Sequence, residues 1–247
     1  MKVIGSDLYE QGLDAAIKEI IALSSEAPQN RLISPSDANV LVHARRNKDF
    51  KAILDQYFWN LPDGVPSVWI LKLKGAKQAT RCSGPDLFEQ VIRATAHLPI
   101  NHYLCGGAEG TAKELAKKCL SWGNKNIVGY YSPPFKELTT ADYEKMAKEI
   151  NAVETAILWV GLGAPKQIYF SHHISKFTQV QFIIPIGAAF DFHTDKVKKA
   201  PKWIQKCGME WFYRLCQEPK RLAGRYFKVV PLFLWYNFIG IFQKNRH

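Results

Sequence analysis

The spacing of hydrophobic and polar residues predicts a chain in which helices and strands alternate. Leu13, Ile17, Ile20 and Ile21 recur at helical spacing, which predicts an amphipathic helix over residues 13–23. Short apolar runs predict strands at residues 31–34, 103–105, 126–129, 156–160 and 180–186. Helices are predicted between these strands, from residue 111, over about 140–151 and over about 165–177. The helix that opens at Thr111 carries a Thr-x-x-Glu pattern with Glu114, which indicates a capping box.

This alternation is typical of right-handed βαβ units around a parallel sheet. After Asp191 it stops, and the chain becomes basic, rich in tryptophan and helical, with Pro201, Pro219 and Pro231 as expected breaks. The predicted fold class is therefore α/β, a Rossmann-like parallel sheet flanked by helices, with a helical, basic C-terminal appendage. We place the catalytic domain at residues 1–193 and the appendage at residues 194–247.

Glycine turns follow several of the predicted strands, at the edge where open parallel sheets bind ligands. The clearest is Gly161-Leu-Gly-Ala-Pro-Lys-Gln167, directly after the apolar run at residues 156–160. Its glycines allow backbone N–H groups to approach a ligand, and Lys166 strengthens the preference of a helix N-terminus for an anion. Similar turns stand at Gly106-Gly107, Gly129-Tyr130 and residues 187–191. Each turn taken alone is equally compatible with a plain tight connection.

The composition excludes disordered and fibrous proteins, because 47% of the 247 residues are hydrophobic and 22% are charged. The net charge is +11, and ten basic but two acidic residues lie within residues 196–228. A charge gathered in this way predicts a polyanionic partner or an anionic surface.

Cysteine usage and hydropathy bear on the compartment. The five cysteines form no CxxC pair, which argues against a disulfide framework or a zinc cluster and favours a reducing, cytoplasmic compartment. We expect no signal peptide, because no basic head precedes an apolar run at the N-terminus.

Residues 230–242 form a thirteen-residue apolar run. A spanning helix needs about 20 residues, so this run is compatible with lying in a membrane interface. Trp203, Trp211, Trp235 and Tyr236 interleave with the basic residues, as in an interfacial belt or as in packing against the main domain.

Further blocks stand in a fixed order along the chain: Leu61-Pro-Asp-Gly64, Arg81-Cys-Ser-Gly-Pro-Asp-Leu87, Gly106-Gly107, Gly129-Tyr-Tyr-Ser-Pro-Pro-Phe135, Gly187-Ala-Ala-Phe-Asp-Phe192, Ala200-Pro-Lys-Trp203, Glu210-Trp-Phe-Tyr-Arg-Leu215 and Gln217-Glu-Pro-Lys-Arg-Leu222. With the turn at residues 161–167, they resemble the WecG/TagA/CpsF family of bacterial glycosyltransferases over about residues 30–228. The resemblance implies transfer, with inversion, of an N-acetylmannosamine-type sugar or related hexose from a UDP-sugar to a polyprenyl-diphosphate-linked saccharide. It also implies that the protein takes part in cell-surface polysaccharide synthesis. The enzyme would be bound peripherally to the inner, anionic face of the cell membrane.

Such a transfer needs a base for the acceptor hydroxyl and positive charge for the departing diphosphate. Asp63 is the candidate base, since Pro62 and Gly64 fix it in a turn. From the residues alone a hydrogen bond to its own turn is the favoured role of Asp63, but the family's proposed base lies in the matching motif. Arg81 is the second candidate catalytic residue, as a cationic group suited to the diphosphate.

The diphosphate is expected to be held without a metal or other cofactor, because no Asp-x-Asp motif stands at a convincing strand end. Arg214, Arg221 and Arg225 suit this task, since guanidinium groups match phosphate oxygens. Arg214 and Arg221 would share a helical face if no break intervened, although Pro219 lies between them. A solvated basic face is the alternative. In the family, the corresponding arginines are thought to reach the active site.

The nucleotide-sugar is expected to contact residues at the strand ends, namely Gly106, Gly107, Tyr130, Gly161, Gly163, Lys166, Gln167 and Asp191. Two departures from the family stand out. Ile168 replaces the Glu that usually follows Pro-Lys-Gln, and residues 33–39 lack the usual Thr followed by Asn. Ser34, with Ser36 or Asp37, is the expected replacement on the acceptor side.

Two other classes of protein were weighed. A nucleic-acid-binding protein would explain the charge but would leave the strand-end glycines unused. A nicotinamide-dependent oxidoreductase would need a G-x-G-x-x-G turn after the first strand, and the chain lacks one there. The predicted partners are therefore a UDP-sugar, a lipid-linked saccharide and an anionic membrane, without nucleic acid. A homo-oligomer, the sugar and the acceptor are left open.

Overall fold

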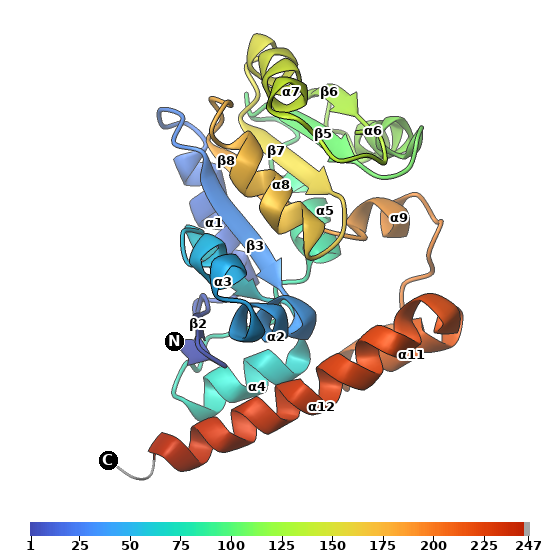
Figure 1. Cartoon of the computed structure of the whole chain (residues 1–247). Helices are drawn as coiled ribbons and strands as arrows, with labels where there is room; N and C mark the ends of the chain where they lie inside the picture. Colours follow the sequence, from blue (N-terminus) through green and yellow to red (C-terminus); the bar gives the residue numbers. More distant parts are fainter. Residues whose placement is uncertain (245–247) are drawn as a thin grey trace.

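A six-stranded parallel sheet forms the centre of the computed structural model (Figure 1). The structure describes residues 1–244, without the side chains of Lys202, Lys206, Arg221 and residues 240–244. The strand order is β4-β3-β8-β7-β5-β6, and every neighbouring pair is parallel. The strands are β3 (Arg31–Ser36), β4 (Trp59–Pro62), β5 (His102–Gly106), β6 (Ile127–Tyr131), β7 (Ile157–Gly161) and β8 (Phe182–Pro185). The predicted α/β class with a parallel sheet is confirmed.

Helices cover both faces of this sheet. One layer contains α1 (Leu13–Leu23), α5 (Gly84–Ala94), α6 (Thr111–Ser121) and α9 (Ala189–His193). The other contains α2 (Ala38–Arg46), α3 (Lys48–Leu54), α7 (Thr140–Ala152) and α8 (Lys166–Ile174). Because side chains alternate along a strand, Trp159 of β7 packs into the first layer, while its neighbours Leu158 and Val160 pack into the second. Burial on both faces explains why β7 and β8 are continuous apolar runs.

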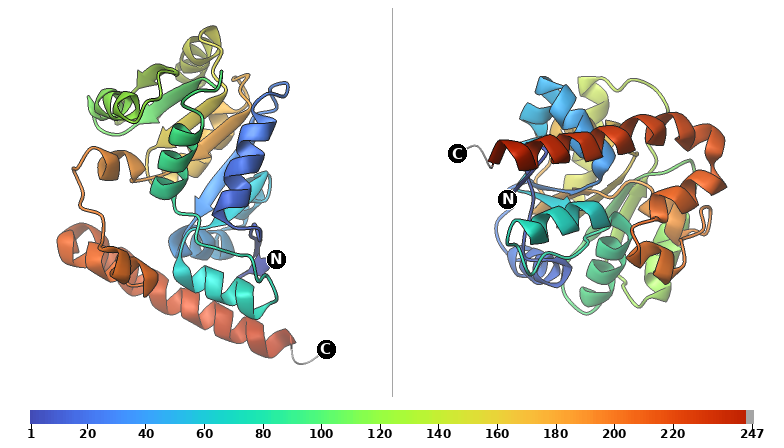
Figure 2. Two further views of the ribbon diagram at one scale, coloured as in Figure 1. Left: turned by 180° about the vertical axis from the view of Figure 1, so that it is seen from behind. Right: turned by 90° about the horizontal axis from the view of Figure 1, so that it is seen from below.

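A third apolar cluster ties the C-terminal helices to the N-terminal half. The C-terminal elements are α10 (Lys202–Lys206), α11 (Glu210–Gln217) and α12 (Pro219–Lys244). Val229 and Phe233 of α12 are buried together with Leu41 of α2 and Val68 of α4 (Val65–Leu73). The small hairpin of β1 (Lys2–Val3) and β2 (Ser6–Asp7) closes this cluster. Figure 2 shows α12 running along α4 and α2.

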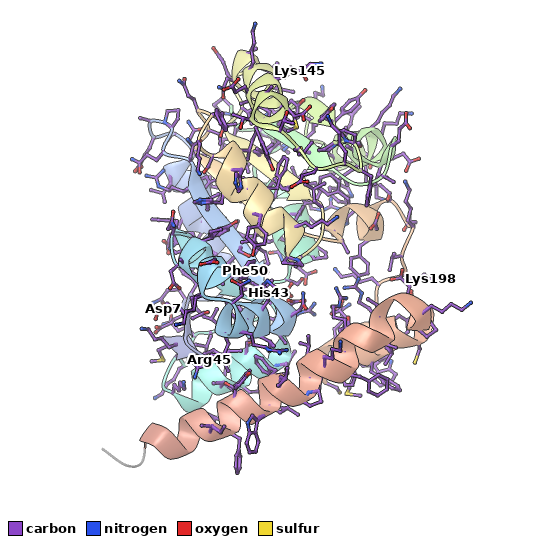
Figure 3. The ribbon with its side chains drawn as sticks, viewed as in Figure 1. Asp7, His43, Arg45, Phe50, Lys145 and Lys198 are labelled. Atoms are coloured by element: carbon purple, nitrogen blue, oxygen red, sulfur yellow. The ribbon has the colours of Figure 1, made fainter. Side chains whose placement is uncertain are left out.

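A cation–π contact and hydrogen bonds of the linker also hold the C-terminal helices in place. The Arg45 guanidinium of α2 lies 5.9 Å from the centre of the Tyr236 ring of α12 (Figure 3). Residue 193, where we predicted the end of the main domain, is the last residue of α9. In the linker that follows, the Lys196 ammonium donates to Thr111 at 2.7 Å, and Gln217 of α11 donates to the Lys198 carbonyl at 3.2 Å. The C-terminal segment is thus packed against the sheet domain at several points.

Several predicted boundaries hold, and three local predictions are wrong. The helix over residues 13–23 is α1, whereas the helix expected over 165–177 ends at Ile174. Pro231 does not break α12, because buried Val229 and Phe233 hold the helix on both sides of it. Thr111 is not an N-cap: Gly110, in a left-handed conformation with φ 81°, takes that place, and the Thr111 hydroxyl accepts from Lys196 instead. A capping box exists at Thr139 and Asp142 of α7.

Over the part of the chain that the structure describes, every helix is either too short or too polar to cross a membrane.

Candidate active site

The candidate site lies where the parallel strands end, because the carboxyl ends of parallel strands meet at one edge of the sheet. Asp63 follows β4 directly, and its N–H donates to the Ser36 carbonyl at the end of β3, at 3.3 Å. This bond joins the two strand ends and fixes the turn in which Asp63 stands. Among the described residues, the Asp63 carboxylate accepts no hydrogen bond from its own turn, so its side chain is available for another task.

The surroundings of the Asp63 carboxyl raise its pKa and so make it a weaker acid than an exposed aspartate. Burial raises its pKa to about 7, against the opposing positive charge of Arg81. Three neighbouring carboxylates, those of Asp37, Glu210 and Asp86, contribute to this raised pKa. About 25% of the Asp63 side chain nevertheless remains exposed, so a ligand can reach it. A carboxylate with a pKa near neutrality suits proton abstraction at neutral pH.

Arg81 connects Asp63 with the C-terminal helices. Its Nε atom lies 3.9 Å from a carboxylate oxygen of Asp63. One terminal nitrogen lies 2.5 Å from Glu210 of α11, and the other donates to the side-chain oxygen of Gln205 of α10 at 3.3 Å. Arg81 therefore lies beside the candidate base, but its closest contacts are with residues of α10 and α11.

The other predicted arginines divide between two helices. Arg214 lies on α11, whereas Arg221 and Arg225 lie on α12, because the helix is interrupted between Gln217 and Pro219. The shared helical face of Arg214 and Arg221 is therefore not formed. The Arg214 guanidinium lies 5.1 Å from the ring centre of Phe192 in α9, next to Asp191. The side chain of Arg221 lies outside the described part.

Two of these guanidinium groups carry an unsatisfied donor. Among the described residues, the Nε atoms of Arg214 and Arg225 are buried and have no hydrogen-bond partner. A buried donor without a partner is costly, and an anion is the group that best satisfies a guanidinium. Of the two, Arg214 is the one that lies beside α9, over the Phe192 ring.

The strand-end glycines are required by close packing. A Cβ atom on Gly106, whose φ is +141°, would lie 2.5 Å from the Gly161 carbonyl oxygen. A Cβ atom on Gly161 would lie 2.8 Å from the Phe190 ring, and the Gly107 N–H donates to the Gly161 carbonyl at 2.8 Å. Space around Gly163 is open within 4 Å. Thus Gly106 and Gly161 bring the ends of β5 and β7 together, and a side chain at position 163 would meet open space.

Gln167 links two of these turns. Its side-chain oxygen accepts from the N–H of Gly163 at 3.2 Å and from the N–H of Gly187 at 2.9 Å. The residue is buried, with 4% of its surface exposed. Its oxygen therefore holds the turns after β7 and β8, and its amide NH₂ group is the part left for a ligand. Ile168 beside it is fully buried in the second helix layer, so this position faces the core.

The residues expected on the acceptor side are less accessible. Ser34 and Ser36 are fully buried, and the Ser36 hydroxyl donates to the Ser34 carbonyl at 3.2 Å. Asp37 caps α2, accepting from the Val40 N–H at 2.9 Å. Of these three residues, Asp37 is the one with exposed surface and an electrostatic effect on Asp63.

The remaining predicted residues are spread along the edge. Tyr130 is exposed on β6, and Lys166 lies over the Phe135 ring at 5.5 Å. Asp191 lies in the first turn of α9. Five strand spacings separate β6 from β4, or about 24 Å. Tyr130 is therefore far from Asp63, whereas β8, which leads to Asp191, is two strands from β4.

Sequence reasoning missed Gln205 and Glu210, which contact Arg81, and the pair formed by Lys199 and Asp86 at 2.5 Å. One signal was available: Glu210 is one of two acidic residues in a segment with ten basic ones. Among the described residues, no group of three or more His, Cys, Asp or Glu side chains is arranged to hold a metal ion.

Comparison with known proteins relates the chain to one family and to individual relatives. The model of the Glycosyl transferase WecG/TagA/CpsF family matches residues 1–247. The chain is also similar to N-acetylglucosaminyldiphosphoundecaprenol N-acetyl-beta-D-mannosaminyltransferase of Bacillus subtilis (strain 168), with 27% identity over 191 residues. That match covers 77% of this chain and 73% of the relative.

The bonds to Gln167 lead to a prediction about stability. Replacing Gln167 with Met leaves the partly buried N–H groups of Gly163 and Gly187 without an acceptor. We expect the free energy of unfolding to fall by about 1–3 kcal/mol, measured by chemical denaturation. Gln181→Met, which removes an exposed side-chain bond to the Glu26 carbonyl, is the control and should change it by less than about 0.5 kcal/mol. Equal effects would show that Gln167 does not hold the turns.

Proposed function

Because the chain belongs to the WecG/TagA/CpsF family of glycosyltransferases, we propose that it transfers a sugar of N-acetylmannosamine type, or a related hexose, from a UDP-sugar to a polyprenyl-diphosphate-linked saccharide. The name of the Bacillus subtilis relative supports this choice, since it gives N-acetylmannosamine as the sugar moved and an N-acetylglucosaminyl diphosphoundecaprenol as the acceptor. The proposed setting is cell-surface polysaccharide synthesis. The observation that carries the proposal is Asp63, with its raised pKa, beside Arg81 at the strand ends.

In the proposed reaction, Asp63 takes the proton of the acceptor hydroxyl while the hydroxyl oxygen attacks the anomeric carbon of the donor. The bond from this carbon to the diphosphate breaks, and its electron pair leaves with UDP. Attack from the side opposite the diphosphate inverts the configuration. The negative charge that develops on the diphosphate is stabilised by Arg214 and Arg225.

Asp63→Asn tests the base. We expect kcat to fall by about 10²–10⁴, because one general base is lost, while the affinity for UDP changes little. Asp55→Asn, which removes a surface pair with Lys51, is the control and should transfer at the wild-type rate. Since the base works only when ionised and its pKa is about 7, kcat/KM of the wild type should fall about tenfold per pH unit below that value and level off above it. Turnover of the Asn variant within a few-fold of wild type would remove Asp63 from this role.

We further propose that the diphosphate is held by cationic side chains without a divalent ion. The buried, unpartnered Nε atoms of Arg214 and Arg225 support this proposal, since each can donate to a phosphate oxygen. Transfer is therefore expected to continue at an unchanged rate in EDTA, measured with metal-depleted enzyme and buffers. Loss of activity on chelation that Mg²⁺ or Mn²⁺ restores would contradict the proposal.

We also propose peripheral attachment to the anionic, cytoplasmic face of the membrane, where a lipid-linked acceptor would be found. Exposed apolar side chains gather on α4 and the C-terminal helices: Trp69, Leu73, Trp203, Phe212, Phe227, Leu234, Trp235 and Phe238. On α12, Phe227, Leu234 and Phe238 recur at helical spacing and share one face. Val229 and Phe233 are buried on another face. The helix is therefore suited to lie along a membrane surface while packed against α2 and α4.

This attachment is tested with Phe227→Ser/Leu234→Ser/Phe238→Ser. We expect wild-type protein to sediment with anionic vesicles in a salt-sensitive manner and the triple variant to lose most of this binding, because insertion of apolar side chains is lost. Leu120→Ser, on the similarly exposed Leu120 of α6, is the control and should bind like wild type. Truncation would expose Leu41 and Val68, so substitutions are preferred. Equal sedimentation of all three proteins would contradict the proposed surface.

A further inference from the structure

Glu210 is an acidic residue in a strongly basic segment, and its side chain is directed at the candidate site. It lies at the start of α11, with 17% of its side chain exposed. Its Oε2 atom is 2.5 Å from a terminal nitrogen of Arg81, whose Nε atom is 3.9 Å from Asp63. The guanidinium therefore stands between two carboxylates, in close contact with the one supplied by the C-terminal segment.

The position of Glu210 is set by how the C-terminal segment is seated. Ala200 is buried, and a Cβ atom on Gly208 would lie 3.2 Å from the Val65 side chain at the start of α4. The Lys199 ammonium lies 2.5 Å from Asp86 of α5. Gln205 accepts from Arg81 at 3.3 Å. These contacts bring α10 and α11 against the turns after β4, so the seating of the segment decides where Arg81 points.

The distance between Arg81 and Asp63 matters for the base. A guanidinium in a close bidentate pair with a carboxylate stabilises its charged form and occupies its oxygens. At 3.9 Å, beyond hydrogen-bond distance, Arg81 leaves the Asp63 oxygens free. Glu210 competes for the same guanidinium. The other charged groups that face Asp63 are Asp37 and Asp86, and Asp86 is itself paired with Lys199.

We propose that Glu210 is a positioning residue, which binds Arg81 and so keeps the guanidinium from closing on Asp63 when the C-terminal helices are seated. This inference rests on the proposed function, in which Asp63 is the base. It assigns the C-terminal segment a second task besides supplying arginines: the segment keeps the base able to accept a proton. Without Glu210, Arg81 would turn to Asp63, and a weaker base would result.

The experiment compares wild-type protein with Glu210→Gln over the full chain. The titration of the Asp63 carboxyl is followed by NMR of ¹³C-labelled aspartate, with Asp63→Asn to assign the signal. We expect the titration midpoint to fall by about one pH unit in the Gln variant, because a negative charge is removed and Arg81 moves closer. Glu114→Gln, which removes a 3.3 Å contact to Lys196 of the linker and leaves Arg81 untouched, should titrate as wild type.

Kinetics give a second readout that a merely structural role would not produce. The acid limb of kcat/KM should move to lower pH in Glu210→Gln, while kcat on the alkaline plateau falls several-fold, since a base of lower pKa accepts a proton less readily. Glu210→Asp keeps the charge on a shorter side chain, so the Asp63 carboxyl in this variant should titrate between its midpoints in wild type and in the Gln variant. If the Gln variant does not fold, the Asp variant tests the inference in its place. A midpoint in either variant at or above that of wild type would overturn the inference. A wild-type protein that transfers no sugar would instead contradict the proposed function, and the NMR titration would still test Glu210.

Discussion

The contact between Arg81 and Glu210 joins the two parts of the protein on which the site depends. Arg81 stands in the connection between α4 and α5, and Glu210 begins α11 far along the chain. Their contact brings a carboxylate of the C-terminal segment close to the turn that holds Asp63. Glu210 is therefore one of the three neighbouring carboxylates that, together with burial, raise the pKa of Asp63.

Charge balance around Asp63 follows from the same packing. The Arg81 guanidinium interacts with the carboxylates of Asp63, Asp86 and Glu210, and Asp37 adds a further negative charge near Asp63, in a protein whose net charge is positive. Negative charges gathered around a carboxyl group raise its pKa, because they disfavour its ionised form. One helical turn along α11 from Glu210, Arg214 lies beside Phe192 of α9 with a buried donor that has no partner among the described residues. The two regions have opposite character, which suits a reaction that removes a proton at one place and leaves negative charge at another.

The helix α12 shows how one element serves two environments. Its buried face, with Leu222, Val229 and Phe233, completes a cluster that the N-terminal hairpin, α2 and α4 cannot close alone. Its exposed face carries Phe227 and Leu234, apolar side chains that a purely aqueous surface would not require. Because the helix is fixed along one side, its exposed apolar residues form a surface of fixed orientation relative to the strand ends.

The sequence by itself determined the local and periodic features of this protein. Apolar periodicity fixed α1, the central strands and the parallel α/β class, since each depends on neighbours a few residues apart. The ordered motifs, not the periodicity, pointed to Asp63 and Arg81, which the structure brings together. Tertiary structure decided the rest. It buried Ser34 and Ser36, directed the Gln167 oxygen to the turns after β7 and β8, and carried α12 through Pro231. Above all, it brought Glu210 to Arg81, because a contact between residues so distant in the chain arises from packing and leaves no periodic signal in the sequence.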